Sequence, residues 1–156
     1  MAYFRHEAIF RPVGGDCFVL YAPKGRVPPI AMNGSGRAPQ AATIERLREL
    51  GLSEIGYQSP HAVTVPGAVD AWSQLLADHG SKGFAELLQP AIRFAEDGYA
   101  VSPRIAMDWA ANAQKLADCP TAKRIFLPGG KSPDVGDMHR QPELAGSLKA
   151  IAKDGR

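Results

Sequence analysis

The first part of the chain alternates apolar runs with turn residues in the manner of a β-hairpin. Cys17–Tyr21 is a short apolar run bounded by glycines and by Pro23, which is typical of a buried strand. A turn follows, and Ile30–Met32 is the expected returning strand. Asn33-Gly-Ser-Gly36 then ends the pattern with residues that tolerate positive φ. The pattern therefore predicts a hairpin followed by a tight loop.

The remainder of the chain has mainly helical spacing. His61–Pro66 alternates like one more strand. Around it, apolar positions recur every three or four residues, with glycine or proline at the ends of the segments. Helices are expected over residues 43–50, 69–79, 84–88, 90–96, 103–118 and 142–151. Trp72 and Trp109 lie on apolar stripes and are predicted to be core residues.

This order of elements predicts the α+β class, with a layer of helices covering a sheet. Three short strands make a thin sheet for five or six amphipathic helices. We therefore expect apolar faces that this chain alone does not cover.

Composition narrows the function classes. The chain has 156 residues, about one domain, and its net charge of +2 with no Lys/Arg block argues against a nucleic-acid partner. Its longest apolar run, Cys17–Ala22, is too short to cross a membrane. The charged N-terminus does not resemble a signal peptide, so the chain as written is expected in the cytoplasm, whereas a longer parent could be periplasmic or secreted. Cys17 and Cys119 are predicted to be buried thiols.

Common cofactor motifs are incomplete. Gly130-Lys131-Ser132 resembles the end of a phosphate-binding loop, but the required earlier glycine is Ile125. Gly34 and Gly36 lack the third glycine of a dinucleotide fingerprint, because that position is Pro39. The four histidines have no metal-ligand spacing. We therefore expect no cofactor and no metal.

Three segments are more specific than their composition, and they occur in a characteristic order. They are Gly14-Gly-Asp-Cys-Phe18, Asn33-Gly-Ser-Gly-Arg-Ala-Pro39, and His61-Ala-Val-Thr-Val-Pro-Gly67 leading into Val69-Asp-Ala-Trp72. In this order they resemble the large-subunit region of the γ-glutamyltranspeptidase family. The resemblance continues through residues 87–92, 98–103, 127–130 and 141–144. It implies a partial large-subunit domain over residues 14–156, preceded by an atypical segment over residues 1–13.

The resemblance implies an N-terminal-nucleophile hydrolase, whose αββα sandwich this chain would supply only in part, mostly the helical layer and a few strands. In the family, a precursor cleaves itself, and the new N-terminal Thr of the small subunit attacks a γ-glutamyl amide of glutathione or a related compound. Thr43, Thr64 and Thr121 do not lie in a matching Thr-Thr-His context, so no catalytic residue is assigned. The chain is expected to be a fragment, inactive until a small-subunit-like chain supplies the nucleophile.

Arg37 and Ser35 are the predicted substrate-binding residues. In transpeptidases an Arg-Glu-x-Ala-Pro segment supplies the arginine that pairs with the substrate's α-carboxylate. Here Ser35 occupies the matching position and the arginine is Arg37, two residues before Pro39. A guanidinium can offer two parallel hydrogen bonds to a carboxylate. Because the spacing differs, an acylase-like member of the family fits as well.

Two alternatives remain at this stage. The chain could be a non-catalytic α+β module that binds a carboxylate ligand through Arg37, or a protein partner. It could also be an amidase that uses Cys17, but this residue opens the most apolar run of the chain, and burial would make the thiol inert.

Overall fold

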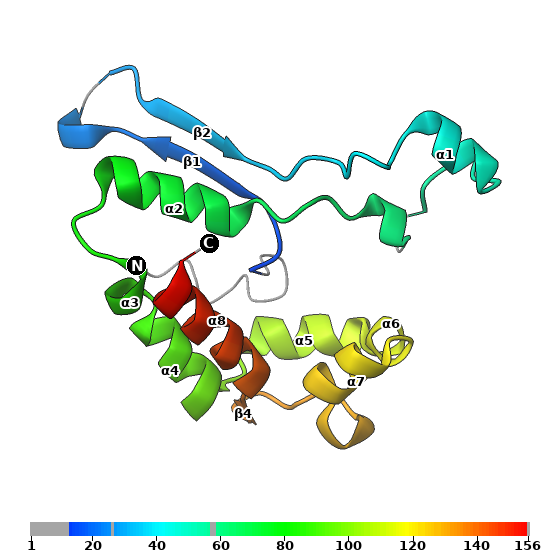
Figure 1. Ribbon diagram of the computed structural model, residues 1–156. Coiled ribbons are helices and arrows are strands. Elements are labelled where there is room, and N and C mark those ends of the chain that lie inside the picture. Colours follow the sequence, from blue (N-terminus) through cyan, green and yellow to red (C-terminus); the bar gives the residue numbers. More distant parts are fainter. Residues whose placement is uncertain (1–12, 26, 57–58, 156) are drawn as a thin grey trace. The chain divides into compact units, whose positions relative to one another are not determined.

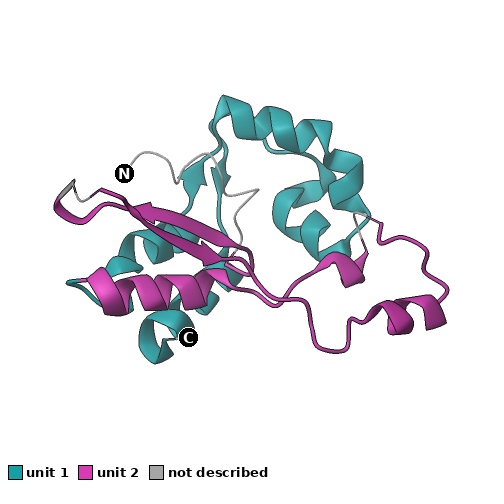
Figure 2. Ribbon diagram, turned by 90° about the horizontal axis from the view of Figure 1, so that it is seen from above, with its two compact units in different colours: residues 1–6, 81–155 teal, residues 7–80, 156 magenta. Residues whose placement is uncertain are grey.

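A computed structural model describes residues 13–25, 27–56 and 59–155. The described chain divides into an N-terminal unit, residues 13–80, and a helical unit, residues 81–155 (Figure 2). The segment predicted to be atypical, residues 1–13, lies outside the described residues except for residue 13.

The predicted hairpin forms in the N-terminal unit. Strands β1 (Cys17–Tyr21) and β2 (Ile30–Gly34) pair antiparallel, with Cys17 opposite Gly34 and Tyr21 opposite Ile30 (Figure 1). A single 3₁₀ turn, Pro23–Gly25, follows β1. Helix α2 (Ala68–His79) packs on one face of this hairpin, and the Tyr21 and His79 rings meet there with centroids 4.6 Å apart. The strands therefore have one covered and one open face.

The open face of the hairpin is apolar. Alternate residues of both strands are half-buried, as the period of two requires. The outward residues Phe18 and Leu20 expose 66% and 76% of their surface. The expectation that some apolar faces stay uncovered in this chain is confirmed for this face of the hairpin.

A short helix, α1 (Ile44–Glu49), follows the tight loop. The Thr43 hydroxyl caps it by accepting a hydrogen bond from the Arg46 amide at 3.2 Å, and Gly51 adopts a φ of 75° just beyond its end. Both ends lie close to those predicted. No residue of α1 is buried, and Ile44 is 64% exposed.

The strand predicted over His61–Pro66 is not present. A 3₁₀ turn occupies Pro60–Ala62, capped by the Ser59 hydroxyl, and residues 63–67 that follow form neither a helix nor a strand. A serine followed by proline favours a turn, and Pro66 has no amide hydrogen to donate to a ladder. The alternation of apolar residues was therefore a misleading signal in this segment.

Three helices pack together in the helical unit, namely α3 (Phe84–Leu87), α4 (Gln89–Asp97) and α8 (Pro142–Asp154). Their apolar faces bury four side chains, Ile92, Ala95, Ala145 and Leu148. Gly98 ends α4 with a φ of 93°. A two-residue strand follows, β3 (Tyr99–Ala100), which pairs antiparallel with β4 (Met138–His139). Strands this short carry no detectable periodicity, which is why the sequence did not predict them.

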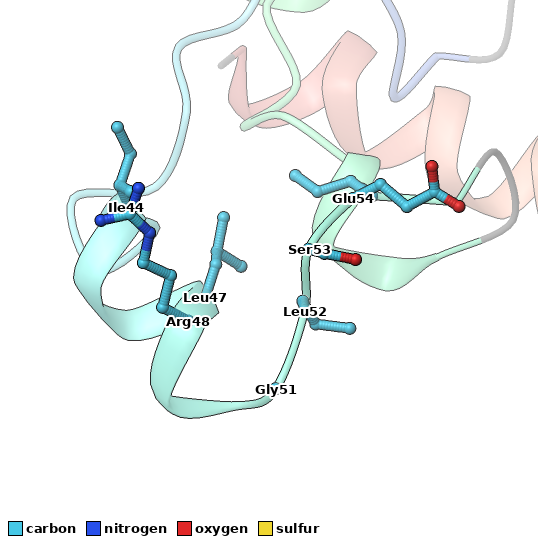
Figure 3. Close-up of a pocket in the computed structure, with 8 residues that line it drawn as sticks. Ile44, Leu47, Arg48, Gly51, Leu52, Ser53 and Glu54 are labelled. Carbon is cyan, nitrogen blue, oxygen red and sulfur yellow. The ribbon is translucent and has the colours of Figure 1, made fainter.

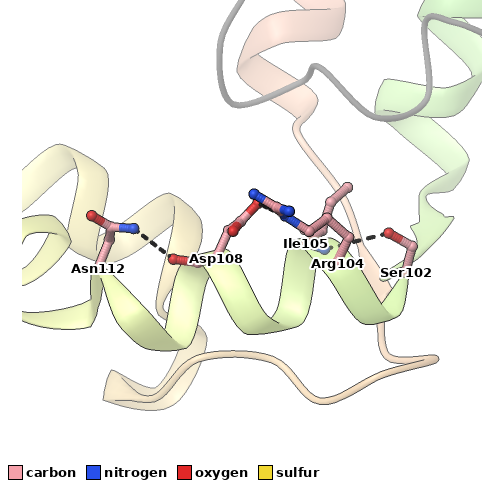
Figure 4. A network of polar contacts seen from close by, with 5 residues as sticks. All are labelled: Ser102, Arg104, Ile105, Asp108 and Asn112. Carbon is pink, nitrogen blue, oxygen red and sulfur yellow. Dashed lines mark hydrogen bonds and ion pairs between the residues drawn. The ribbon is translucent and has the colours of Figure 1, made fainter.

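The helix predicted over residues 103–118 is interrupted. Helix α5 (Pro103–Ala111) begins where the Ser102 hydroxyl accepts from the Ile105 amide at 3.4 Å, as expected (Figure 4). Asn112 donates its side-chain amide to the Asp108 carbonyl at 2.8 Å, and this local bond competes with helix continuation. The helix resumes as α6 (Ala113–Ala117). The next helix, α7 (Pro120–Phe126), was not predicted. A turn at Pro128–Gly130 follows, within the predicted loop.

An aromatic cluster forms part of the core of the helical unit. Trp109 is 2% exposed, as predicted, and His139 is 4% exposed. The two rings meet edge to face with centroids 4.8 Å apart, and Tyr99 and Phe126 lie at 5.6 Å and 6.0 Å from the same imidazole. In contrast to the prediction, Trp72 in the N-terminal unit is only half-buried, and the smaller neighbours on its helix, Ala68 and Ala71, are buried.

Burial lowers the pKa of His139 below its usual value of 6.5. The unfolded chain therefore binds more protons than the folded chain once the pH falls below about 6.5, and folding stability decreases with acidification. We expect His139→Gln to flatten this dependence, measured as the free energy of unfolding in denaturant at pH 7, 6 and 5. His61→Gln, at an exposed histidine, should keep the original slope. Equal slopes for His139→Gln and the unmodified chain would contradict this assignment.

Candidate functional site

The three segments that carry the family resemblance meet at one end of the hairpin. We call this place the junction, formed by residues 14–16 before β1, residues 33–37 at the end of β2, and residues 64–67 before α2. Figure 1 shows the start of β1, the end of β2 and the start of α2 side by side. Segments about fifty residues apart in the chain thus build one local structure within the N-terminal unit.

Backbone hydrogen bonds tie these segments together. The amides of Gly67 and Ala68 both donate to the Gly15 carbonyl, at 3.3 Å and 2.9 Å. The Val65 amide donates to the Arg37 carbonyl at 2.9 Å. The segment before α2 is therefore held by both of the other segments.

Glycines allow the backbones to come this close. A Cβ atom on Gly36 would lie 1.6 Å from the Val65 carbonyl oxygen, and one on Gly67 would lie 2.4 Å from the Gly34 oxygen. A Cβ on Gly34 would collide with Ala71 of α2 at 2.4 Å. These distances are far inside van der Waals contact, so side chains at these positions require the backbone to move.

Two side chains hold the loop between Asn33 and Arg37. The Asn33 side-chain oxygen accepts a hydrogen bond from the Ser35 amide at 2.9 Å, which closes a tight turn. The Asp16 carboxylate accepts from the Gly36 amide at 3.2 Å. Successive amides of the loop are thus bound by two different acceptors.

Both predicted substrate-binding residues lie on this loop and are exposed. Arg37 follows the braced Gly36, and its carbonyl is held by Val65. Within the described part of the chain, the Arg37 guanidinium forms no ion pair or hydrogen bond. The structure places Ser35 and Arg37 at the junction, and their role in binding substrate stays a prediction.

A separate open hollow of about 740 Å³ lies beside α1 (Figure 3). Its lining is mostly aliphatic, including Ile44, Leu47 and Leu52, with Arg48 and Glu54 as the charged members. Neither predicted binding residue lines it.

The described residues offer limited catalytic or metal-binding chemistry. Cys17 is half-buried and Cys119 is exposed, so the prediction that both are buried is wrong for Cys119 and is met only in part for Cys17. No group of three or more His, Cys, Asp or Glu residues suitable for a metal gathers in residues 13–25, 27–56 or 59–155. In the same ranges, no helix has the length and apolar character needed to span a membrane. The Thr43 hydroxyl is engaged as a helix cap.

Solved structures establish the class. The chain superimposes on a cephalosporin acylase from Bacillus halodurans with a TM-score of 0.84 and 35% identity, covering 93% of this chain and 28% of that one. It also matches the γ-glutamyltranspeptidase of Helicobacter pylori with a TM-score of 0.78 and 30% identity, covering 92% and 42%. The fold is therefore an α+β portion of an N-terminal-nucleophile hydrolase.

The model of the γ-glutamyltranspeptidase family matches residues 8–156, and the chain belongs to this family. Among curated relatives it is similar to the glutathione hydrolase-like YwrD proenzyme of Bacillus subtilis, with 36% identity over 145 residues. That match covers 92% of this chain and 27% of the relative. The chain thus spans about a quarter of the length of the relative.

Sequence reasoning identified the three segments but did not assign a role to Asp16 or to the individual glycines. The sequence shows the Gly14-Gly15-Asp16 motif directly. Its partner could not be known, because the bonded amide lies twenty residues away.

The junction predicts a specific sensitivity to alanine. Gly36→Ala should lower the free energy of unfolding by about 1–3 kcal/mol, because its methyl group collides with the Val65 carbonyl. Gly56→Ala is the matched control, since a Cβ there has open space. Chemical denaturation followed by circular dichroism measures both changes, and equal stabilities of the two variants would show that the close approach is not required.

Proposed function

We propose that this chain is part of an amide-cleaving acyl-transfer enzyme and that its junction binds the carboxylate of a γ-glutamyl substrate. The observation that carries the proposal is the exposed Arg37 guanidinium on a braced loop, without an internal partner among the described residues, in a chain of the γ-glutamyltranspeptidase family.

Arg37 has suitable chemistry for this role. A guanidinium presents a planar fork of N–H donors that matches the two oxygens of a carboxylate. Hydrogen bonds to charged groups contribute about 1.5–3 kcal/mol each, enough to orient a small substrate. Ser35 lies two residues away on the same loop, and its hydroxyl can donate to the same carboxylate.

The fixed loop supports the same assignment. Asn33, Asp16 and Val65 hold its backbone, so less conformational entropy has to be lost when the ligand binds. A cationic group that is already in place binds an anion more tightly than one on a mobile loop.

The nucleophile is proposed to come from outside this chain. A relative is named a proenzyme, which supports a precursor that is cleaved to expose an N-terminal Thr in a small-subunit-like chain. The Thr hydroxyl oxygen would attack the amide carbon while its free α-amine takes the proton, and the leaving amine would depart with a proton. The acyl group would then pass to an amino acid, a peptide or water. This chemistry requires no metal or organic cofactor.

The relatives differ in the acyl group that their names indicate. A structural relative is a cephalosporin acylase, and the curated relative is glutathione hydrolase-like. We propose γ-glutamyl compounds first, because the α-carboxylate is the group that Arg37 is suited to hold.

A chromogenic amide tests both parts. We expect the purified chain to bind γ-glutamyl para-nitroanilide without releasing para-nitroaniline. NMR titration measures the binding. Arg37→Ala should weaken binding by about tenfold or more, the loss expected for one charge-assisted hydrogen bond. Arg48→Ala removes the same charge from α1 and should leave the affinity unchanged.

A second ligand tests whether Arg37 acts on the α-carboxylate. The γ-aminobutyryl para-nitroanilide lacks only the α-carboxylate, so its weaker binding should not respond to Arg37→Ala. Equal affinity of Arg37→Ala and the unmodified chain for the γ-glutamyl compound would refute the carboxylate site. Release of para-nitroaniline by the chain alone at an enzymatic rate would refute the external nucleophile.

A further inference from the structure

The hydrogen bond from the Gly36 amide to the Asp16 carboxylate joins two parts of the junction that are far apart in the chain. Asp16 lies immediately before β1, and Gly36 lies just after β2. Both strands are fixed by their mutual pairing, with Cys17 opposite Gly34, so the carboxylate starts from a rigid position.

Gly36 is the glycine of this loop that directly precedes Arg37. The Val65 carbonyl lies where a Cβ at this position would be, and a glycine without restraint samples many φ/ψ combinations. The Val65 amide restrains the following carbonyl, that of Arg37. The Asp16 carboxylate restrains the peptide between Ser35 and Gly36, one residue before Arg37, by accepting a hydrogen bond from the Gly36 amide.

We propose that Asp16 is a positioning residue that holds the Ser35–Gly36 peptide, one residue before Arg37, so that the guanidinium is presented in one orientation to the substrate carboxylate. This inference rests on the proposed function of Arg37. Without an acceptor at residue 16, the Gly36 amide would bond to water instead, and the loop would have to be ordered each time a ligand binds.

The chemistry separates this role from a direct electrostatic one. Asp16 is exposed, and a negative charge there repels the α-carboxylate of the ligand. If its contribution is the acceptor oxygen, an asparagine with the same oxygen preserves the position and removes the repulsion. Asp16→Asn should therefore bind the γ-glutamyl anilide at least as tightly as the unmodified chain.

The test is a double-mutant cycle in the full chain, with the γ-glutamyl para-nitroanilide as the probe. Asp16→Ala should weaken binding by about threefold to tenfold, the range expected for one hydrogen bond. In the Arg37→Ala background the same change should have no further effect, because the group being positioned is gone. Glu54→Ala, which removes another exposed carboxylate of the N-terminal unit, should not change the affinity.

Hydrogen exchange gives an independent readout. The Gly36 amide should exchange faster in Asp16→Ala than in Asp16→Asn, because only the second retains an acceptor. If Asp16→Ala reduces the folded population, the inference is tested by comparing the affinity of Asp16→Asn with that of the unmodified chain. Weaker binding by Asp16→Asn overturns the inference.

The remaining outcomes are also decisive. Unchanged binding by Asp16→Ala, together with a loss in Arg37→Ala, overturns the positioning role and leaves the proposed function standing. Additive losses in the double variant overturn it as well, because they show that Asp16 acts independently of Arg37. No dependence on Arg37 overturns the proposed function and the positioning role together.

Discussion

The close approach of three backbone segments at glycine positions is the constraint on which the N-terminal unit depends. The space where a Cβ of Gly36 would lie is occupied by the Val65 carbonyl, and the corresponding space at Gly67 is occupied by the Gly34 oxygen. Only with these side chains absent can the segment before α2 reach the Gly15 and Arg37 carbonyls with its amides. The helix then begins directly over the end of the hairpin, with Ala71 against Gly34.

This arrangement explains how an exposed loop acquires a defined shape. Loops usually have few internal contacts and many accessible conformations. Here the amides of Ser35 and Gly36 and the carbonyl of Arg37 are each bound, although all three residues lie near the surface. A rigid backbone next to a guanidinium that has no partner among the described residues is a suitable basis for recognising a carboxylate.

The helical unit is organised by a different principle. Its core combines the aliphatic faces of α4 and α8 with an aromatic cluster around His139. The Nε2 atom of this imidazole lies 3.2 Å from the Gln141 side-chain nitrogen. A neutral imidazole can accept a hydrogen bond there, and burial favours the neutral form. Burial of His139 thus makes the stability of this unit depend on pH.

Local patterns were sufficient for the hairpin, for α1 and for the start of α5 at Ser102, because each of these depends on residues close in sequence. The order of the three glycine-containing segments was also sufficient to indicate the family. Tertiary structure decided the rest. The pairing of Tyr99 with His139, the choice of Ala68 and Ala71 over Trp72 for burial, and the bond between Asp16 and Gly36 all join positions whose distance in space no local pattern encodes. Periodicity records which side of an element is apolar, whereas the partner of that side, or of a single carboxylate, is set only when distant segments come together.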